Sequence, residues 1–217
     1  MIFAQRDQET NAPAVHLRNS FDPEICKKIM EDVVKQAPAE KATHAHGDGI
    51  DSIDEKRMST VRWFVDHGFE QHLRQAVNLA NFNAGWKYDI IKPEILQFTE
   101  YAPKDHYNWH TDGTCDHHAA RYWQETEQQQ NLCETRDPEL LGTVRKISAS
   151  VILNDDYEGG ELEFVILNEK AQVEITKITP EVGSVVVFPS FIMHRVLPVT
   201  KGTRYSVVAW YGGPPFK

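Results

Sequence analysis

From Glu94 to the C-terminus, short apolar-patterned segments alternate with turns, and this pattern limits the fold more than any other feature of the chain. Residues Arg145 to Leu153 alternate, with Ile147, Ala149, Val151 and Leu153 on one side, which is typical of a strand with one buried face. Gly159-Gly160 then supplies a turn, because paired glycines accept positive φ. Further strands are expected at 95–98, 107–110, 161–166, 172–175, 184–188, 194–199 and 203–211. Many short strands separated by turns favour an antiparallel sandwich or jelly roll.

The first part of the chain, residues 1–93, is expected to form a mainly helical support for this β region. Asp22-Pro23 is a helix start, with an N-cap followed by proline at the first helical position. Pro38 would end this helix. A second helix is expected near 69–81. The first helix would bury one apolar stripe made of Ile25, Ile29, Val33 and Val34.

No linker or internal repeat divides the chain, so 1–217 is expected to be a single domain with its β core at 94–217. One segment, Gly113–Gly142, does not fit the strand pattern and is rich in Gln, Glu and His. A connection this long is usually functional or disordered. A lid over a neighbouring site and a loosely helical surface insertion both remain open for it.

Charge and composition exclude several partners. The formal net charge of −9 weighs against nucleic acid and anionic membrane, because phosphate binding needs a basic face. No apolar run approaches the roughly 20 residues that span a bilayer. Met1–Thr10 has charged residues where a signal peptide needs an apolar core. The cysteines, Cys26, Cys115 and Cys133, are few and odd in number, so we expect a reduced, cytoplasmic protein.

Chemistry is indicated by His110-Thr111-Asp112 followed, on a later strand-like segment, by His194. Side chains alternate along a strand, so His110 and Asp112 would project from one face and reach one ion. Two imidazoles and one carboxylate suit ferrous iron and leave coordination positions open. The same alternation places Arg204, Ser206, Val208 and Trp210 on one face of the last strand. Arg204 and Ser206 would then form a docking point for a dicarboxylate such as 2-oxoglutarate.

The chain contains other histidines that could bind a metal, and they matter because a His-x-Asp tripeptide alone is a weak signal. A rival group has equally suggestive spacing but lies in a polar, glycine-bearing segment, where a solvated loop is expected: His44, His46 and Asp48. His117 and His118 are adjacent and would diverge on a strand. His106 and His16 have no evident partner in the pattern.

Two long stretches resemble a known enzyme family. Arg145–Phe164 reads RKISASVILNDDYEGGELEF, and Pro180–Trp210 reads PEVGSVVVFPSFIMHRVLPVTKGTRYSVVAW. Together with the His-x-Asp pair, they resemble the Fe(II)/2-oxoglutarate-dependent dioxygenases of the prolyl 4-hydroxylase group, and especially the bacterial PKHD-type hydroxylases. The resemblance implies a mainly β fold with flanking α-helices. That fold is a double-stranded β-helix, a cupin-like form of jelly roll, with helices packed against one sheet.

Roles for individual residues follow from the same resemblance. The implied iron ligands are His110, Asp112 and His194. Arg204 would pair with the distal carboxylate of 2-oxoglutarate, and Ser206 and the phenol of Tyr101 would complete that pocket. The residues implied to line a peptide site are Glu94, Arg145 and Trp210. Collagen-type members often have lysine where this chain has Arg204, and the Gly113–Gly142 segment replaces a loop that covers substrate in related enzymes.

The implied function is hydroxylation of an unactivated C–H bond, with prolyl 4-hydroxylase action on a peptidyl proline as the leading hypothesis. Fe(II), 2-oxoglutarate and O2 are the implied reagents, and ascorbate binding, with ascorbate as reductant, is a further expectation. A peptide or protein substrate is expected. The alternatives are a hydroxylase of a free amino acid or small metabolite and a catalytically silent binding module. Zinc-dependent hydrolysis is disfavoured, because there is no His-Glu-x-x-His motif.

Overall fold

A computed structural model describes residues 13–42, 57–113, 137–167 and 170–216. Three of the sequence-based predictions lie outside these ranges. They are the rival set at His44, His46 and Asp48, the His117-His118 pair, and the nature of the Gly113–Gly142 segment between residues 114 and 136.

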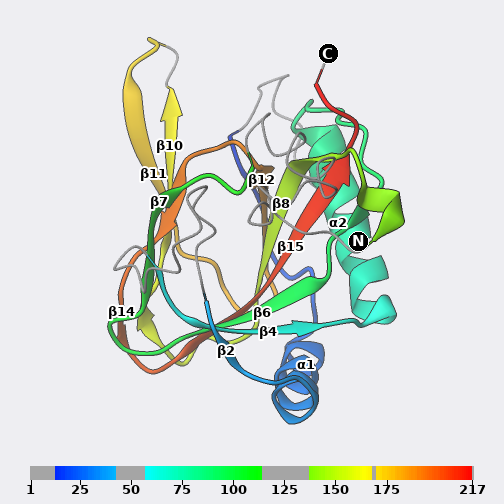
Figure 1. The fold of residues 1–217 in the computed structure, drawn as a ribbon. Coiled ribbons are helices and arrows are strands. Elements are labelled where there is room, and N and C mark those ends of the chain that lie inside the picture. Colours follow the sequence, from blue (N-terminus) through cyan, green and yellow to red (C-terminus); the bar gives the residue numbers. More distant parts are fainter. Residues whose placement is uncertain (1–12, 43–56, 114–136, 168–169, 217) are drawn as a thin grey trace, which may run out of the picture.

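Within the described ranges the chain is mainly β, with two antiparallel sheets facing each other (Figure 1). The larger sheet has the order β1-β12-β8-β15-β6-β4-β2, and β5 also pairs with β15. Its strands are β1 (Val15–Leu17), β2 (Glu40–Lys41), β4 (Thr60–Phe64), β5 (Lys92–Pro93), β6 (Leu96–Tyr101), β8 (Val144–Ile152), β12 (Val185–Pro189) and β15 (Arg204–Gly213). The predicted jelly roll is confirmed.

The smaller sheet has the order β11-β10-β13-β7-β3, and β14 pairs with β9 beside it. Its strands are β3 (Arg57–Met58), β7 (His106–His110), β10 (Leu162–Leu167), β11 (Val173–Ile178) and β13 (His194–Val196). The pair consists of β9 (Glu158–Gly159) and β14 (Val199–Lys201). The prediction of a single strand at 194–199 is therefore wrong. Two strands, β13 and β14, lie on either side of Pro198, which has no N–H to donate to a strand ladder.

Two helices, α1 (Pro23–Gln36) and α2 (His67–Asn83), cover the outer face of the larger sheet (Figure 1). The predicted start of α1 is confirmed, since the Asp22 carboxylate accepts from the Glu24 N–H at 2.8 Å. The predicted stripe is partly wrong, because Ile25 and Val34 are 45% and 47% exposed. The buried stripe consists of Cys26, Ile29 and Val33. Among the described residues, no helix has the length and apolarity needed to cross a membrane.

The alternation predicted for β8 separates two interiors. Ile147, Ala149 and Val151 face the helices and belong to the core between helices and sheet. The residues between them, including Ser148 and Ser150, are also buried but point toward the smaller sheet. A second apolar cluster fills the space between the sheets: Tyr101, Leu162, Phe164, Val186, Phe188, Val196 and Val199. The polar side chains of the candidate site lie at this second interior.

Candidate metal centre

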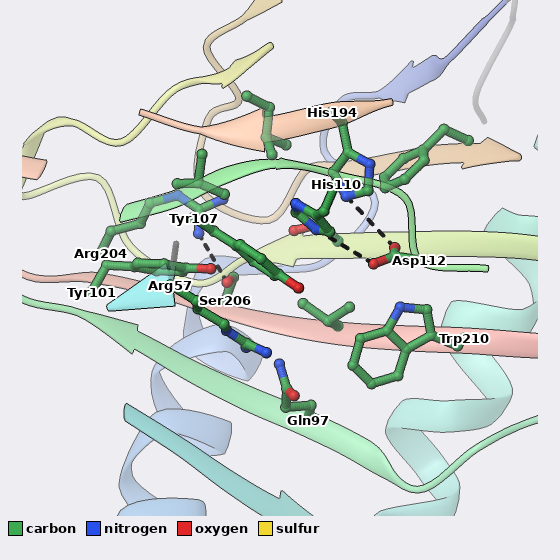
Figure 2. Close-up of a pocket in the computed structure, with 15 residues that line it drawn as sticks. Arg57, Gln97, Tyr101, Tyr107, His110, Asp112, His194, Arg204, Ser206 and Trp210 are labelled. Carbon is green, nitrogen blue, oxygen red and sulfur yellow. Dashed lines mark hydrogen bonds and ion pairs between the residues drawn. The ribbon is translucent and has the colours of Figure 1, made fainter. Parts of the chain in front are cut away.

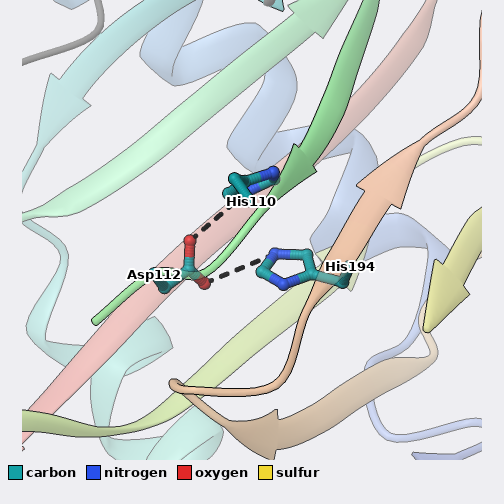
Figure 3. A group of neighbouring side chains, drawn as sticks. All are labelled: His110, Asp112 and His194. Carbon is teal, nitrogen blue, oxygen red and sulfur yellow. Dashed lines mark ion pairs between the residues drawn. The ribbon is translucent and has the colours of Figure 1, made fainter. Parts of the chain in front are cut away.

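His110, Asp112 and His194 converge in the space between the sheets (Figure 3). His110 is the last residue of β7 and His194 the first of β13, and the two are direct partners across these antiparallel strands. The Asp112 carboxylate lies between them, 3.6 Å from His110 Nε2 and 3.7 Å from His194 Nε2. Their potential ligand atoms all lie within 4.8 Å of one another, and all three residues are buried. This spacing is compatible with one shared metal ion.

Backbone carbonyls orient both imidazole rings. The Nδ1 atom of His110 lies 2.7 Å from the carbonyl oxygen of Asn108, and that of His194 lies 2.9 Å from the carbonyl oxygen of Ile192. A carbonyl can only accept a hydrogen bond, so each Nδ1 carries the proton and donates. Each Nε2 then presents its lone pair toward Asp112, which is how second contacts usually prepare histidine ligands.

The protonation states also suit metal binding. Burial alone would raise the pKa of Asp112, but the adjacent His194 and His110 rings and hydrogen bonding hold it well below its usual range. Burial lowers the pKa of His194 to about 4, despite the opposing effect of Asp112. Near neutral pH, the site therefore holds a carboxylate and a neutral His194 imidazole, the forms that bind a metal ion.

Beside this triad is a pocket with an empty volume of about 440 Å³, including its mouth (Figure 2). Arg204 lies at the opposite side of it from Asp112 and Trp210 and is 1% exposed. Its Nη1 donates to the Ser206 hydroxyl at 3.0 Å, whereas Nε and Nη2 have no hydrogen-bond partner among the described residues. A buried cation without an acceptor is unfavourable. The pocket therefore fits a ligand that brings an anionic group to Arg204.

The other residues predicted around Arg204 are in place. Tyr101 is opposite Arg204 across β6 and β15, and the Arg204 guanidinium carbon lies 5.5 Å from the Tyr101 ring centre. Ser206, Val208 and Trp210 line the same pocket, as the alternation of the last strand predicted.

The three residues predicted to bind substrate lie together, but only Trp210 lines the pocket. The Arg145 guanidinium stacks over the Trp210 ring at 4.2 Å and forms two hydrogen bonds to Glu94, at 2.8 and 2.6 Å. The indole Nε1 of Trp210 is buried without a partner among the described residues. Glu94 and Arg145 thus form a layer next to Trp210 instead of a wall of the pocket.

Among the pocket residues that sequence reasoning missed are Tyr107 and Arg57. Tyr107 stacks on the His110 ring at 3.4 Å between centres, and the Arg57 guanidinium lies 4.6 Å from the Tyr107 ring centre. In a regular strand, residues three apart face opposite sides. Here β7 contains an irregularity, where His110 and Tyr107 pair with His194 and Val196, and this brings both rings to one side. Arg57 has no local signal in the sequence.

Comparison with known proteins agrees with this geometry. A family model described as the 2OG-Fe(II) oxygenase superfamily matches residues 96–212. A PKHD-type hydroxylase of Crocosphaera subtropica is 33% identical over 143 residues, which are 62% of this chain and 50% of that protein. A PKHD-type hydroxylase of Escherichia coli is 28% identical over 141 residues, 63% of this chain and 52% of that protein. The matches thus span about half the length of these curated relatives.

Solved structures show the same fold. A viral collagen prolyl hydroxylase of Paramecium bursaria Chlorella virus-1, in a 2OG complex, superposes with a TM-score of 0.60 at 18% identity, covering 93% of this chain and 97% of that one. A Trichoplax adhaerens prolyl hydroxylase, in complex with a peptide fragment of hypoxia inducible factor, gives 0.64 at 16% identity, covering 92% and 83%.

The family match extends over more than half of the chain and includes the His-Asp-His triad. This chain therefore belongs to the 2OG-Fe(II) oxygenase superfamily, as its sequence predicted. The family implies Fe(II), 2-oxoglutarate and dioxygen as reagents.

Proposed function

We propose that this member of the 2OG-Fe(II) oxygenase superfamily binds Fe(II) through His110, Asp112 and His194 and hydroxylates an unactivated C–H bond. The observation that carries the proposal is one pocket with two complementary parts. One side has a buried carboxylate between two histidine Nε2 atoms. The other has a buried guanidinium with two nitrogen atoms that find no acceptor in the described parts of the chain. Both fit the reagents that the family implies.

In this proposal, His110, Asp112 and His194 would hold the iron, which would supply the oxidising chemistry together with 2-oxoglutarate and dioxygen. Arg204 binds the distal carboxylate of 2-oxoglutarate through Nε and Nη2, and Ser206 holds Arg204 in position through Nη1. Tyr101 flanks the same group. One oxygen atom of dioxygen becomes the hydroxyl of the product. The other enters succinate as 2-oxoglutarate loses carbon dioxide.

The Phe164 and Phe188 rings exclude water from one side of the triad. Their centres lie 5.9 and 4.6 Å from the His194 ring centre. Tyr107 covers His110 in the same way. Aromatic rings therefore cover both histidine ligands, which limits side reactions with solvent.

A peptidyl proline is the substrate we propose, with hydroxylation of the prolyl 4-hydroxylase type. The support is that two solved structures with this fold are prolyl hydroxylases, and that the curated relative from Crocosphaera subtropica is a hydroxylase. Trp210 adds an indole N–H at the pocket wall that is buried without a partner among the described residues, and this group can donate to a substrate carbonyl. A reductant role for ascorbate and a cytoplasmic setting remain predictions from the sequence.

Anaerobic addition of Fe(II), then 2-oxoglutarate, tests the centre. We expect the visible charge-transfer band of the chelate, its loss in His110→Ala and its retention in His106→Ala, a control on the same strand outside the triad. Absence of the band in the unmodified protein, or an equal band in His110→Ala, would contradict the proposal.

Mass spectrometry of products then identifies the substrate class. Gain of one oxygen on the proline of a peptide supports the proposed substrate. Gain of oxygen on a free amino acid or small metabolite would replace it with the alternative. A normal charge-transfer band without turnover of any candidate peptide or metabolite would favour a catalytically silent binding module.

A further inference from the structure

The metal ligand Asp112 lies outside the strand ladder that positions the two histidines. β7 ends at His110, so regular pairing stops two residues before Asp112. The backbone N–H groups of Asp112 and Gly113 both donate to the carbonyl of Ser190, at 2.9 and 3.0 Å. The carbonyl of Asp112 accepts from Nη1 of Arg145 at 2.9 Å. One loop carbonyl and one side chain therefore hold this ligand's backbone.

Arg145 is itself fixed in orientation. Its Nε and Nη2 donate to the two carboxylate oxygens of Glu94, and its guanidinium lies over the Trp210 ring. The Arg145 and Glu94 side chains are only 15% and 16% exposed. A bidentate, partly buried arginine–carboxylate pair is rigid, because the planar fork matches the carboxylate. The contact to Asp112 is thus made by a side chain that has little freedom to move.

Close packing reinforces the same contact. A Cβ atom at Gly113 would lie 2.9 Å from the Cβ of Arg145, closer than such atoms approach. Gly113 therefore allows the chain that leaves Asp112 to pass directly against Arg145. Any larger residue at 113 would push the ligand loop away from the guanidinium.

We infer that Glu94 and Arg145 are positioning residues for the metal ligand Asp112. Through the Nη1 contact, the pair orients the Asp112 carboxylate toward His110 and His194 before any substrate binds. This inference rests on the proposed metal-binding function and adds to it a second layer of contacts. It differs from the substrate-binding role implied for these residues by the sequence resemblance, because neither lines the pocket.

Metal affinity in the absence of substrate tests the inference. Anaerobic calorimetry with Co(II), together with its visible spectrum, measures both affinity and ligand geometry. We expect Glu94→Gln and Arg145→Gln each to weaken Co(II) binding about 10- to 100-fold, the usual effect of losing contacts behind a metal ligand. We also expect each to alter the Co(II) spectrum, which loss of folding stability alone would not do.

A matched control exists beside His194. Arg195 Nε donates to Oε2 of Glu163 at 2.7 Å, its Nη2 forms an ion pair with the same oxygen at 2.6 Å, and its guanidinium lies over the Trp109 ring at 4.4 Å. Like Arg145, it pairs with a glutamate and lies over a tryptophan ring, and it neighbours a metal ligand in sequence. Among the described residues, no hydrogen bond joins the Arg195 side chain to the backbone of His110, Asp112 or His194. We expect Arg195→Gln to lower the melting temperature but to leave Co(II) affinity and spectrum unchanged.

The outcomes distinguish a failure of the positioning role from a failure of the proposed metal-binding function. If the unmodified protein binds Co(II) and both Glu94→Gln and Arg145→Gln bind it equally well with the same spectrum, the positioning role is wrong. A rise in substrate KM alone would then assign the pair to substrate binding. If the unmodified protein does not bind Co(II), the proposed function itself fails. Should Arg145→Gln not fold, Glu94→Gln decides the question, because it keeps side-chain shape and removes only the charge.

Discussion

Replacement of Arg204 by methionine should separate ligand binding from folding stability. The substitution removes the guanidinium and keeps an unbranched side chain of similar length. Arg204 is 1% exposed, with two nitrogen atoms that have no acceptor among the described residues. In the ligand-free protein, this buried charge is largely uncompensated. We therefore expect the Arg204 guanidinium to contribute far more to the free energy of 2-oxoglutarate binding than to the free energy of unfolding.

The expected loss of 2-oxoglutarate affinity follows from those two nitrogen atoms. One hydrogen bond to a charged group contributes about 1.5–3 kcal/mol. Losing one would weaken binding roughly 10- to 150-fold, since 1.4 kcal/mol corresponds to a factor of ten. With both Nε and Nη2 of Arg204 lost, we expect at least about 100-fold weaker 2-oxoglutarate binding. The free energy of unfolding should fall by no more than about 1 kcal/mol, because replacing a buried charge by an apolar group is often neutral or stabilising.

The assay is calorimetric titration of 2-oxoglutarate into Mn(II)-loaded protein, combined with urea unfolding of the ligand-free protein. Arg62→Met is the matched control. Arg62 is also a largely buried arginine of the larger sheet, on β4. Unlike Arg204, it donates to the Glu100 carboxylate at 2.9 Å and to the Ala37 carbonyl at 2.7 Å. It should lose about 1–3 kcal/mol of stability and keep its 2-oxoglutarate affinity. Unchanged 2-oxoglutarate affinity in Arg204→Met, or a loss of several kcal/mol in stability, would refute the reasoning.

Three further changes have defined outcomes. Gly183→Ala should lower the free energy of unfolding by more than about 1 kcal/mol in urea titration, because the residue has φ +75° and an added Cβ would lie 2.1 Å from the Phe21 carbonyl oxygen; unchanged stability would contradict this. Leu73→Ala on α2 removes a fully buried side chain and should cost about 2–5 kcal/mol in the same assay. Burial raises the pKa of the Cys26 thiol from 9.0 to about 11. The contribution of this thiol to the free energy of unfolding is therefore fully present below pH 9 and is lost as the pH rises through about 11. Cys26→Ala should remove this part of the pH dependence, and an identical slope in both proteins would show that the thiol does not contribute.

The helices and most strands could be predicted because their signals are local. A period of two along β8 and β15 marks which side chains face the helices and which face the site. An N-cap followed by proline marks the start of α1. The full set of buried side chains on that helix could not be predicted in the same way. Ile25 and Val34 are apolar but lie beside the buried line, where the sheet does not reach them.

The candidate metal ligands were also accessible from sequence, since residue type and order along the chain mark His110, Asp112 and His194. The alternation expected to continue to Asp112 was wrong, because β7 ends at His110 and the Asp112 carboxylate reaches the site from the following loop. The contacts that shape the site were not accessible from sequence. Tyr107 reaches His110 only because β7 is irregular opposite β13, and Arg57 arrives from a separate strand at the edge of the sheet.

The sequence by itself determined a two-sheet β fold with helices on one face, the histidine–aspartate–histidine set, and the facing of Arg204, Ser206 and Trp210. Those properties depend on residue types, on their spacing within single elements and on the order of these elements along the chain. Only the tertiary structure decided that two nitrogen atoms of the buried Arg204 have no acceptor among the described residues, and that the Glu94–Arg145 pair holds the backbone of Asp112 instead of lining the pocket. These properties depend on how distant strands pack, and no short-range pattern in the chain encodes that packing.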